Sequence, residues 1–157
     1  MVIDFEEATI GKPVPTWTEK GITFSLAEAP KNTKAVGRVM FFPHLTTSHK
    51  GLLNAMANEQ AIPVQAKFPM SVSSVTIKFW ASTGSAAQLQ AFDQNDQVID
   101  TASVAVVPGR KAPEDPVPMF ELTVKGAAIA SIRFSGPRNG EFLAADEVRF
   151  TPAATTK

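Results

Sequence analysis

The sequence contains no cysteine and no tyrosine, and its only histidines are His44 and His49. The absence of cysteine excludes disulfides, thiolate metal ligands and a cysteine nucleophile. Histidine, cysteine and tyrosine often act as general acids and bases, and here they are scarce or absent. Long apolar runs are also absent, and none approaches the roughly 20 residues that a membrane helix requires. These absences argue against an enzyme and against membrane insertion.

Charge of either sign is not in excess, because 15 basic residues balance 15 acidic ones. A chain with no net charge has no overall positive potential to attract nucleic acid, so no nucleic-acid partner is expected. With 44% hydrophobic and 19% charged residues, the composition is that of an ordinary globular protein. Asp4, Glu6 and Glu7 stand where a signal peptide would have its apolar segment, so we expect no signal peptide within the chain.

Apolar and polar residues alternate with a period of two through much of the chain. This alternation is typical of antiparallel strands that have one buried and one solvated face. The clearest runs are 75–80, 88–91, 102–106, 120–124, 131–134 and 147–150. Further strands are predicted at 2–5, 21–27, 36–42 and 62–68. About ten short strands at this spacing indicate an all-β sandwich or barrel.

Turn-forming residues separate the predicted strands. They lie at 83–85, 93–96, 125–126 and 136–140. At most one short helical turn is expected, formed by Leu52, Leu53, Ala55 and Met56. Four prolines predict a long, stiff loop over residues 108–118. We predict a single domain over residues 1–151 and a flexible tail or linker over 152–157.

Six segments carry a resemblance to a known family. In chain order they are VIDFEEATIGKPVPT, GITFS, FPMSVSSVTIKF, LQAFDQNDQVIDTASV, IASIRFSG and FLAADEVRF. Together they resemble the galactose-binding-like β-sandwich domains of bacterial secreted and cell-surface proteins, which include many carbohydrate-binding modules. The resemblance covers nearly the whole chain. It implies an antiparallel two-sheet jelly roll of about 8–10 strands, with the first and last strands as neighbours. It also implies a secreted or cell-surface location, and it implies no particular ligand.

The same resemblance implies a structural calcium ion. Many family members hold calcium between an acidic residue near the first strand and one in the last strand, and the matching positions are Asp4 or Glu6, and Asp146. Asp146 is in phase with Ala144 and Val148, so its carboxylate is expected to face the core. A buried carboxylate needs hydrogen bonds, a cation or a raised pKa. The alternative to calcium is that Asp146 accepts hydrogen bonds from backbone N–H groups.

Two tryptophans are the candidates for stacking against a sugar ring. Trp80 is in the outward phase of its strand, and Trp17 is expected in a proline-containing loop. Aromatic faces bind the apolar C–H surfaces of sugars, although tryptophan more often packs in a protein interior. Arg110, Gln88 and Asn139 are the polar residues expected to hydrogen-bond to the same ligand.

Carboxylates that could pair as in a glycosidase are Glu121, Glu141, Glu147 and Asp93, but no spacing selects a pair. No nucleophile elbow, phosphate loop or dinucleotide motif is present. We therefore predict a non-catalytic module that binds a glycan as part of an extracellular bacterial protein. The alternative is a structural or adhesive spacer with no small ligand. Carbohydrate and neighbouring domains of a longer chain are the expected partners.

Overall fold

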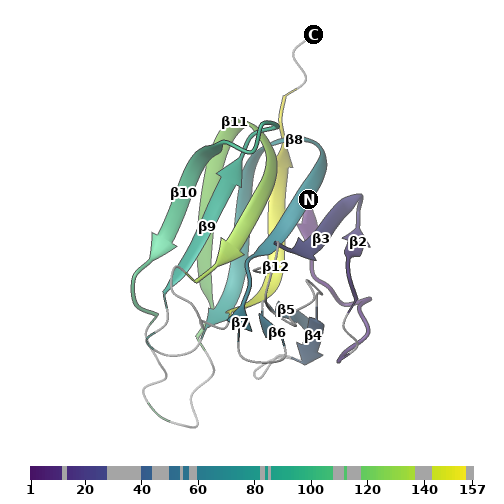
Figure 1. Ribbon diagram of the computed structural model, residues 1–157, viewed down its shortest axis with the longest axis vertical. Coiled ribbons are helices and arrows are strands. Elements are labelled where there is room, and N and C mark those ends of the chain that lie inside the picture. The colour runs from purple at the N-terminus through teal and green to yellow at the C-terminus, as the bar shows by residue number, and fades with distance from the viewer. Residues whose placement is uncertain are drawn as a thin grey trace.

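Every regular element in the described part of the chain is a β-strand (Figure 1). The computed structural model describes residues 1–11, 14–27, 40–43, 50–53, 55–56, 60–81, 84, 86–107, 112, 118–136 and 143–154. The strands are β1 (Val2–Ile3), β2 (Trp17–Glu19), β3 (Ile22–Leu26), β4 (Met40–Pro43), β5 (Lys50–Leu53), β6 (Ala55–Met56), β7 (Gln60–Ala61), β8 (Val64–Ala81), β9 (Ala87–Phe92), β10 (Val98–Val104), β11 (Phe120–Ser135) and β12 (Leu143–Pro152). All the strand pairs among them are antiparallel. The predicted all-β, antiparallel fold class is confirmed.

Two long strands, β8 and β11, organise the whole fold. The carboxyl-terminal part of β11, residues 131–134, pairs with residues 64–67 at the start of β8. Its amino-terminal part, residues 120–125, pairs with residues 74–79 further along β8. The register shifts between Lys125 and Ser131. Such irregularities bend a strand and increase its twist, so each strand contributes to two layers of the sandwich (Figure 1).

One layer contains the start of β8 and the end of β11, and the other contains the end of β8 and the start of β11. In the first layer the order is β10, β9, β11, β8, β3 and β2, using residues 131–135 of β11 and 64–67 of β8. In the second layer β8 pairs with β12, and β12 pairs in turn with β5 and with β1. The pairing of β1 with β12 confirms that the first and last strands are neighbours.

Apolar side chains from the two layers meet in one core. Phe79 of the second layer contacts Phe134 of the first edge to face, with ring centroids 5.0 Å apart. Phe5 and Phe24 make a similar contact at 5.2 Å. All four rings are almost completely buried. Burial of each such side chain stabilises the fold by about 1.5–3 kcal/mol, so this contact region holds the layers together.

Three local predictions are wrong. Residues 50–53 and 55–56 are strands, not a helical turn, because β5 pairs with β4 and β12 and those ladders override the weak helical signal. Trp17 lies in β2, not in a loop. The predicted turn at 125–126 lies inside β11. A Cβ added at Gly126 would lie 2.8 Å from the Ile99 Cδ1 atom, so the Ile99 side chain would have to shift.

Some predictions fall outside the described residues. These are residues 36–39 of the strand predicted at 36–42, residues 83, 85 and 137–140 of two predicted turns, most of the stiff loop over 108–118, and residues 155–157 of the predicted tail. Within the described ranges, β12 extends to Pro152 and the Ala153 N–H donates to the Ser71 carbonyl at 3.0 Å. None of the described residues belongs to a helix long and apolar enough to cross a membrane.

Candidate functional site

The outer face of the first layer is polar across five adjacent strands. Inward-facing residues such as Phe24, Ala66 and Leu89 are buried, and the residues that alternate with them face the opposite way. Residues paired in register share a face of the sheet. The outward set comprises Thr23, Ser25, Gln65, Lys67, Gln88, Gln90, Thr101, Ser103, Ser131 and Arg133. This face therefore presents hydroxyl, amide and cationic groups on a rigid framework.

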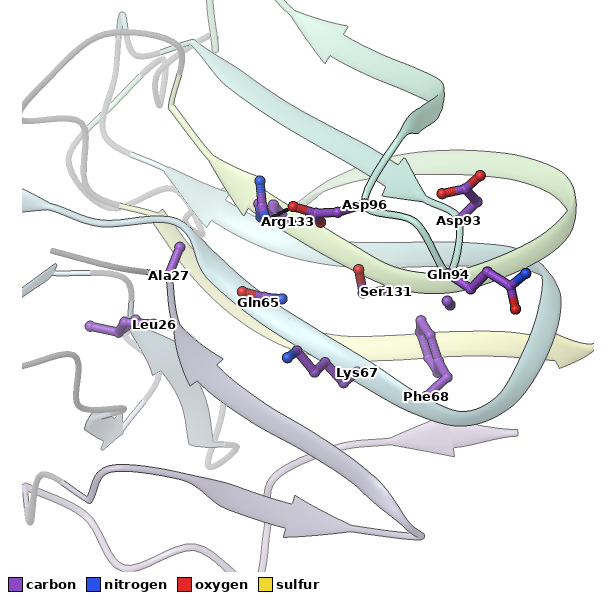
Figure 2. Close-up of a pocket in the computed structure, with 11 residues that line it drawn as sticks. Leu26, Ala27, Gln65, Lys67, Phe68, Asp93, Gln94, Asp96, Ser131 and Arg133 are labelled. Atoms are coloured by element: carbon purple, nitrogen blue, oxygen red, sulfur yellow. Dashed lines mark hydrogen bonds and ion pairs between the residues drawn. The ribbon is translucent and has the colours of Figure 1, made fainter.

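A groove of about 780 Å³ lies on part of this face (Figure 2). Its lining residues are Leu26, Ala27, Gln65, Lys67, Phe68, Asp93, Gln94, Asp96, Ala130, Ser131 and Arg133. Gln65, Lys67 and Ser131 lie in its middle, with the end of β3 toward one side and Phe68 toward the other (Figure 2). The volume is within the range of small-molecule binding sites.

The turn between β9 and β10 forms one wall of the groove. The N–H groups of Asn95 and Gln97 donate to Oδ1 of Asp93 at 2.8 and 2.9 Å. The Asp93 N–H in turn donates to the Gln97 carbonyl at 3.0 Å. The backbone donor of Gln97, helped by that of Asn95, lowers the pKa of the Asp93 carboxyl below its ordinary value of 3.8. The carboxylate thus stays ionised at neutral pH and fixes the turn, which confirms the hairpin predicted at 93–96.

Arg133 ties this turn to the sheet. Its Nη2 donates to both carboxylate oxygens of Asp96, each at 3.0 Å. The guanidinium carbon also lies 4.4 Å from the centroid of the Phe92 ring, in a cation–π contact. The two interactions hold the side chain in one orientation, so the Arg133–Asp96 pair forms a fixed part of the wall.

Lys67 is the cation in this groove that is not matched by a carboxylate. It is exposed near the start of β8, and within the described ranges no salt bridge or side-chain hydrogen bond involves it. Its cross-strand partner is Ser131, which is largely buried, and Gln65 lies two residues away on the same face. An ammonium group flanked by a hydroxyl and an amide is suited to binding an oxygen-rich ligand.

Of the five ligand residues predicted from sequence, the three that the structure describes are not brought together. Gln88 lies on the same outer face as the groove but does not line it. Trp17 packs against the core. Trp80 is half-buried on the part of β8 that belongs to the second layer. Arg110 and Asn139 lie outside the described residues. Ligand binding by these side chains stays a prediction.

Asp146 is buried, with 8% of the residue exposed, but it is not in phase with both Ala144 and Val148 as the sequence suggested. It lies at an irregularity of β12 between Ala145 and Glu147. Its Oδ2 atom is 3.6 Å from Nζ of Lys78. Its Oδ1 atom is buried and has no hydrogen-bond partner among the described residues. Lys78 therefore supplies a counter-charge, while one carboxylate oxygen keeps its capacity to bind a cation.

The other two predicted calcium ligands are engaged in backbone contacts. Asp4 is exposed, and its Oδ1 accepts the Glu6 N–H at 3.3 Å. Oε1 of Glu6 accepts the Lys50 N–H at 2.9 Å. The described ranges contain no group of three or more histidine, aspartate or glutamate side chains that could hold a metal. Of the three predicted ligands, Asp146 alone has a buried carboxylate oxygen with no hydrogen-bond partner among the described residues, and bound calcium stays a prediction.

The carboxylates considered for catalysis are divided between the two layers. Glu121 and Glu147 both contact Arg149 on the second layer, the latter at 3.0 Å from Nε. Asp93 belongs to the groove of the first layer. Glu141 lies outside the described residues. Glu121 and Glu147 thus form a surface ion network with an arginine between them, and the prediction that the chain is not an enzyme stays a prediction.

Sequence reasoning missed the residues that form the middle of the groove. Gln65, Lys67, Ser131 and Arg133 were visible only as the polar partners in alternating strands. The signal that would have found them is the pairing of β8 with β11, because this pairing places Lys67 beside Ser131. A single sequence does not reveal which strands are neighbours in the sheet.

Comparison with known proteins finds no matching family model and no matching curated protein. Similar solved structures include the module TmCBM61 in complex with β-1,4-galactotriose, which is 12% identical with a TM-score of 0.45 and covers 95% of this chain and 94% of its own. The structure described as BiXyn10A CBM1 is 11% identical with a TM-score of 0.45, covering 98% of this chain and 97% of its own. The CBM22-1–GH10 modules of a Clostridium thermocellum xylanase, complexed with xylohexaose, are 11% identical with a TM-score of 0.48 and cover 92% of this chain and 29% of their own. The three are carbohydrate-binding modules or contain one, and likenesses of this size assign no ligand to this chain.

Proposed function

We propose that this chain is a non-catalytic glycan-binding module and that the groove on the first layer is its binding site. The observation that carries the proposal is the groove itself, in which polar side chains converge from β8, β11 and the β9–β10 turn. Paired strands fix the backbone positions from which these side chains project, so the backbone of the site needs no ordering when a ligand binds. The family that the sequence resembles includes many carbohydrate-binding modules.

The chemistry of the groove suits a sugar chain. Sugars present many hydroxyl groups, which need both donors and acceptors. The amides of Gln65 and Gln94 and the hydroxyl of Ser131 supply both. Phe68 lines one side of the groove and is partly exposed, so its ring is within reach of sugar C–H groups. On this proposal the module acts outside the cell, at the cell surface or on a secreted protein.

The groove also favours a binding module over a spacer domain. A spacer needs a stable fold and contacts with neighbouring domains, and neither requires polar side chains to converge in a hollow of this volume. If no carbohydrate binds, the spacer function is favoured instead.

The proposal is tested by screening the protein against neutral and acidic polysaccharides with affinity electrophoresis, followed by calorimetry on oligosaccharides. Gln65→Ala should weaken binding about 3- to 10-fold, the size of one lost hydrogen bond. Gln88→Ala is the matched control, because Gln88 lies on the same face but outside the groove. Melting curves should show that both variants remain folded.

Trp80→Ala tests the rival site. If the groove binds the glycan, this variant keeps the affinity of the original chain, since Trp80 lies on the second layer. Loss of binding in Trp80→Ala, with Gln65→Ala unaffected, would place the site at the tryptophan. Failure of every carbohydrate to bind would favour the spacer.

A further inference from the structure

Four charged side chains line the groove, and three of them are already engaged. Both oxygens of Asp96 accept hydrogen bonds from Arg133. Asp93 uses Oδ1 for two backbone N–H groups of its own turn. Lys67 has no such partner among the described residues. Among the described residues, Lys67 therefore brings to the groove an ammonium group whose three donors are free for a ligand.

The surroundings of Lys67 suit an anion that has more than one acceptor oxygen. Ser131 is directly opposite Lys67 in the pairing of β8 with β11, and Gln65 is two residues along the same face. All three side chains lie in the middle of the groove (Figure 2). Their hydroxyl and amide groups can donate to the second oxygen of an anion held by the ammonium. A hydrogen bond to a charged group is about twice as strong as one between neutral groups.

We infer that the module selects acidic glycans, in which the carboxylate of a uronic acid binds Nζ of Lys67. This inference rests on the proposed function and adds the chemical class of its ligand. Arg133 keeps the wall of the groove in place through Asp96 and Phe92. Lys67 supplies the charge that distinguishes an acidic sugar from a neutral one.

The test uses uronic acid oligosaccharides, each paired with the same oligosaccharide after reduction of its carboxyl groups to alcohols. The pair differs only in the carboxylate, so the ratio of the two dissociation constants measures its contribution. The original chain should bind one acidic oligosaccharide about tenfold more tightly than its reduced form. Added salt should weaken binding of the acidic form and leave binding of the reduced form unchanged.

Lys67→Gln should abolish this preference, and Lys67→Arg should retain it. Lys67 is exposed, so both variants are expected to fold, and melting curves check this. Lys125→Gln is the matched control, because it removes the same charge from an exposed position outside the groove. It should keep the full preference for the acidic oligosaccharide.

Equal affinity for the acidic and reduced forms would overturn the inference and leave glycan binding intact. Retention of the preference in Lys67→Gln would overturn it as well. Tighter binding of sulfated oligosaccharides than of any uronic acid oligosaccharide would overturn the choice of a carboxylate. Failure to bind any glycan, acidic or neutral, would instead overturn the proposed function itself.

Discussion

Replacing Arg133 by methionine tests whether the wall of the groove is fixed as the structure describes. The substitution keeps an apolar stem over Phe92 and removes the guanidinium, with its bonds to Asp96 and its contact with the ring. The Arg133–Asp96 pair is partly exposed, with 31% and 62% of the two side chains accessible to solvent. Such a pair is screened by water and contributes about 0.2–1 kcal/mol.

The cation–π contact with Phe92 adds to the contribution of the ion pair to stability. At 4.4 Å from the ring centroid, its contribution at a partly exposed site is about 0.5–1 kcal/mol. Arg133→Met should therefore lower the free energy of unfolding by about 1–2 kcal/mol. For a domain of this size the melting temperature should fall by about 2–8 °C.

The assay is thermal unfolding followed by circular dichroism, with urea unfolding for the free energy. Asp96→Asn is the matched variant, because it removes the ion pair and leaves the ring contact. It should cost less than Arg133→Met, at most about 1 kcal/mol. Equal losses in the two variants would show that the contact with Phe92 contributes nothing. No loss in Arg133→Met would refute the description of the wall as fixed by this residue.

Three further predictions concern the turn, the core and the metal. Because the pKa of Asp93 is lowered, the carboxylate contributes fully to stability above its ordinary pKa of 3.8, and the contribution is lost as the pH falls through the lower, folded-state value. A carbon-detected NMR titration of Asp93 with a midpoint at or above 3.8 would contradict this prediction. Phe79→Ala removes a fully buried ring that contacts Phe134, so urea unfolding should show a loss of about 3–5 kcal/mol, and a loss under about 1 kcal/mol would contradict the described packing. Calcium at Asp146 predicts that a chelator lowers the melting temperature, that calcium restores it, and that Asp146→Asn removes the response; identical melting curves with and without chelator, on protein shown to be metal-free, would reject the calcium site.

Alternation of apolar and polar residues located most of the strands, because one face of each strand lies against the core. It failed where the alternation is interrupted inside a strand. The runs at 62–68 and 75–80 belong to one strand, β8, and the runs at 120–124 and 131–134 belong to β11. Bulges shift the phase of the side chains without reversing the chain direction. A search for alternation with a period of two therefore predicts two strands where the structure has one bent strand.

The groove was harder to predict than the fold, for a physical reason. Its residues come from the end of β3, from β8 and β11 and from the β9–β10 turn, which are far apart in the sequence and meet only through strand pairing. The prediction from composition favoured tryptophan, because aromatic stacking is the most visible sugar-binding feature in a sequence. Trp17 instead packs against the core, where its large apolar surface is removed from water.

The central claim, that the groove of the first layer binds a glycan, is tested most directly by mapping amide chemical shifts in the isotope-labelled protein during titration with the best oligosaccharide from the screen. The account predicts that the largest shifts lie at Gln65, Lys67 and Ser131 and in the turn at 93–97, with saturation at the dissociation constant found by calorimetry. Shifts centred on Trp80 and the second layer, with the groove unchanged, would contradict it.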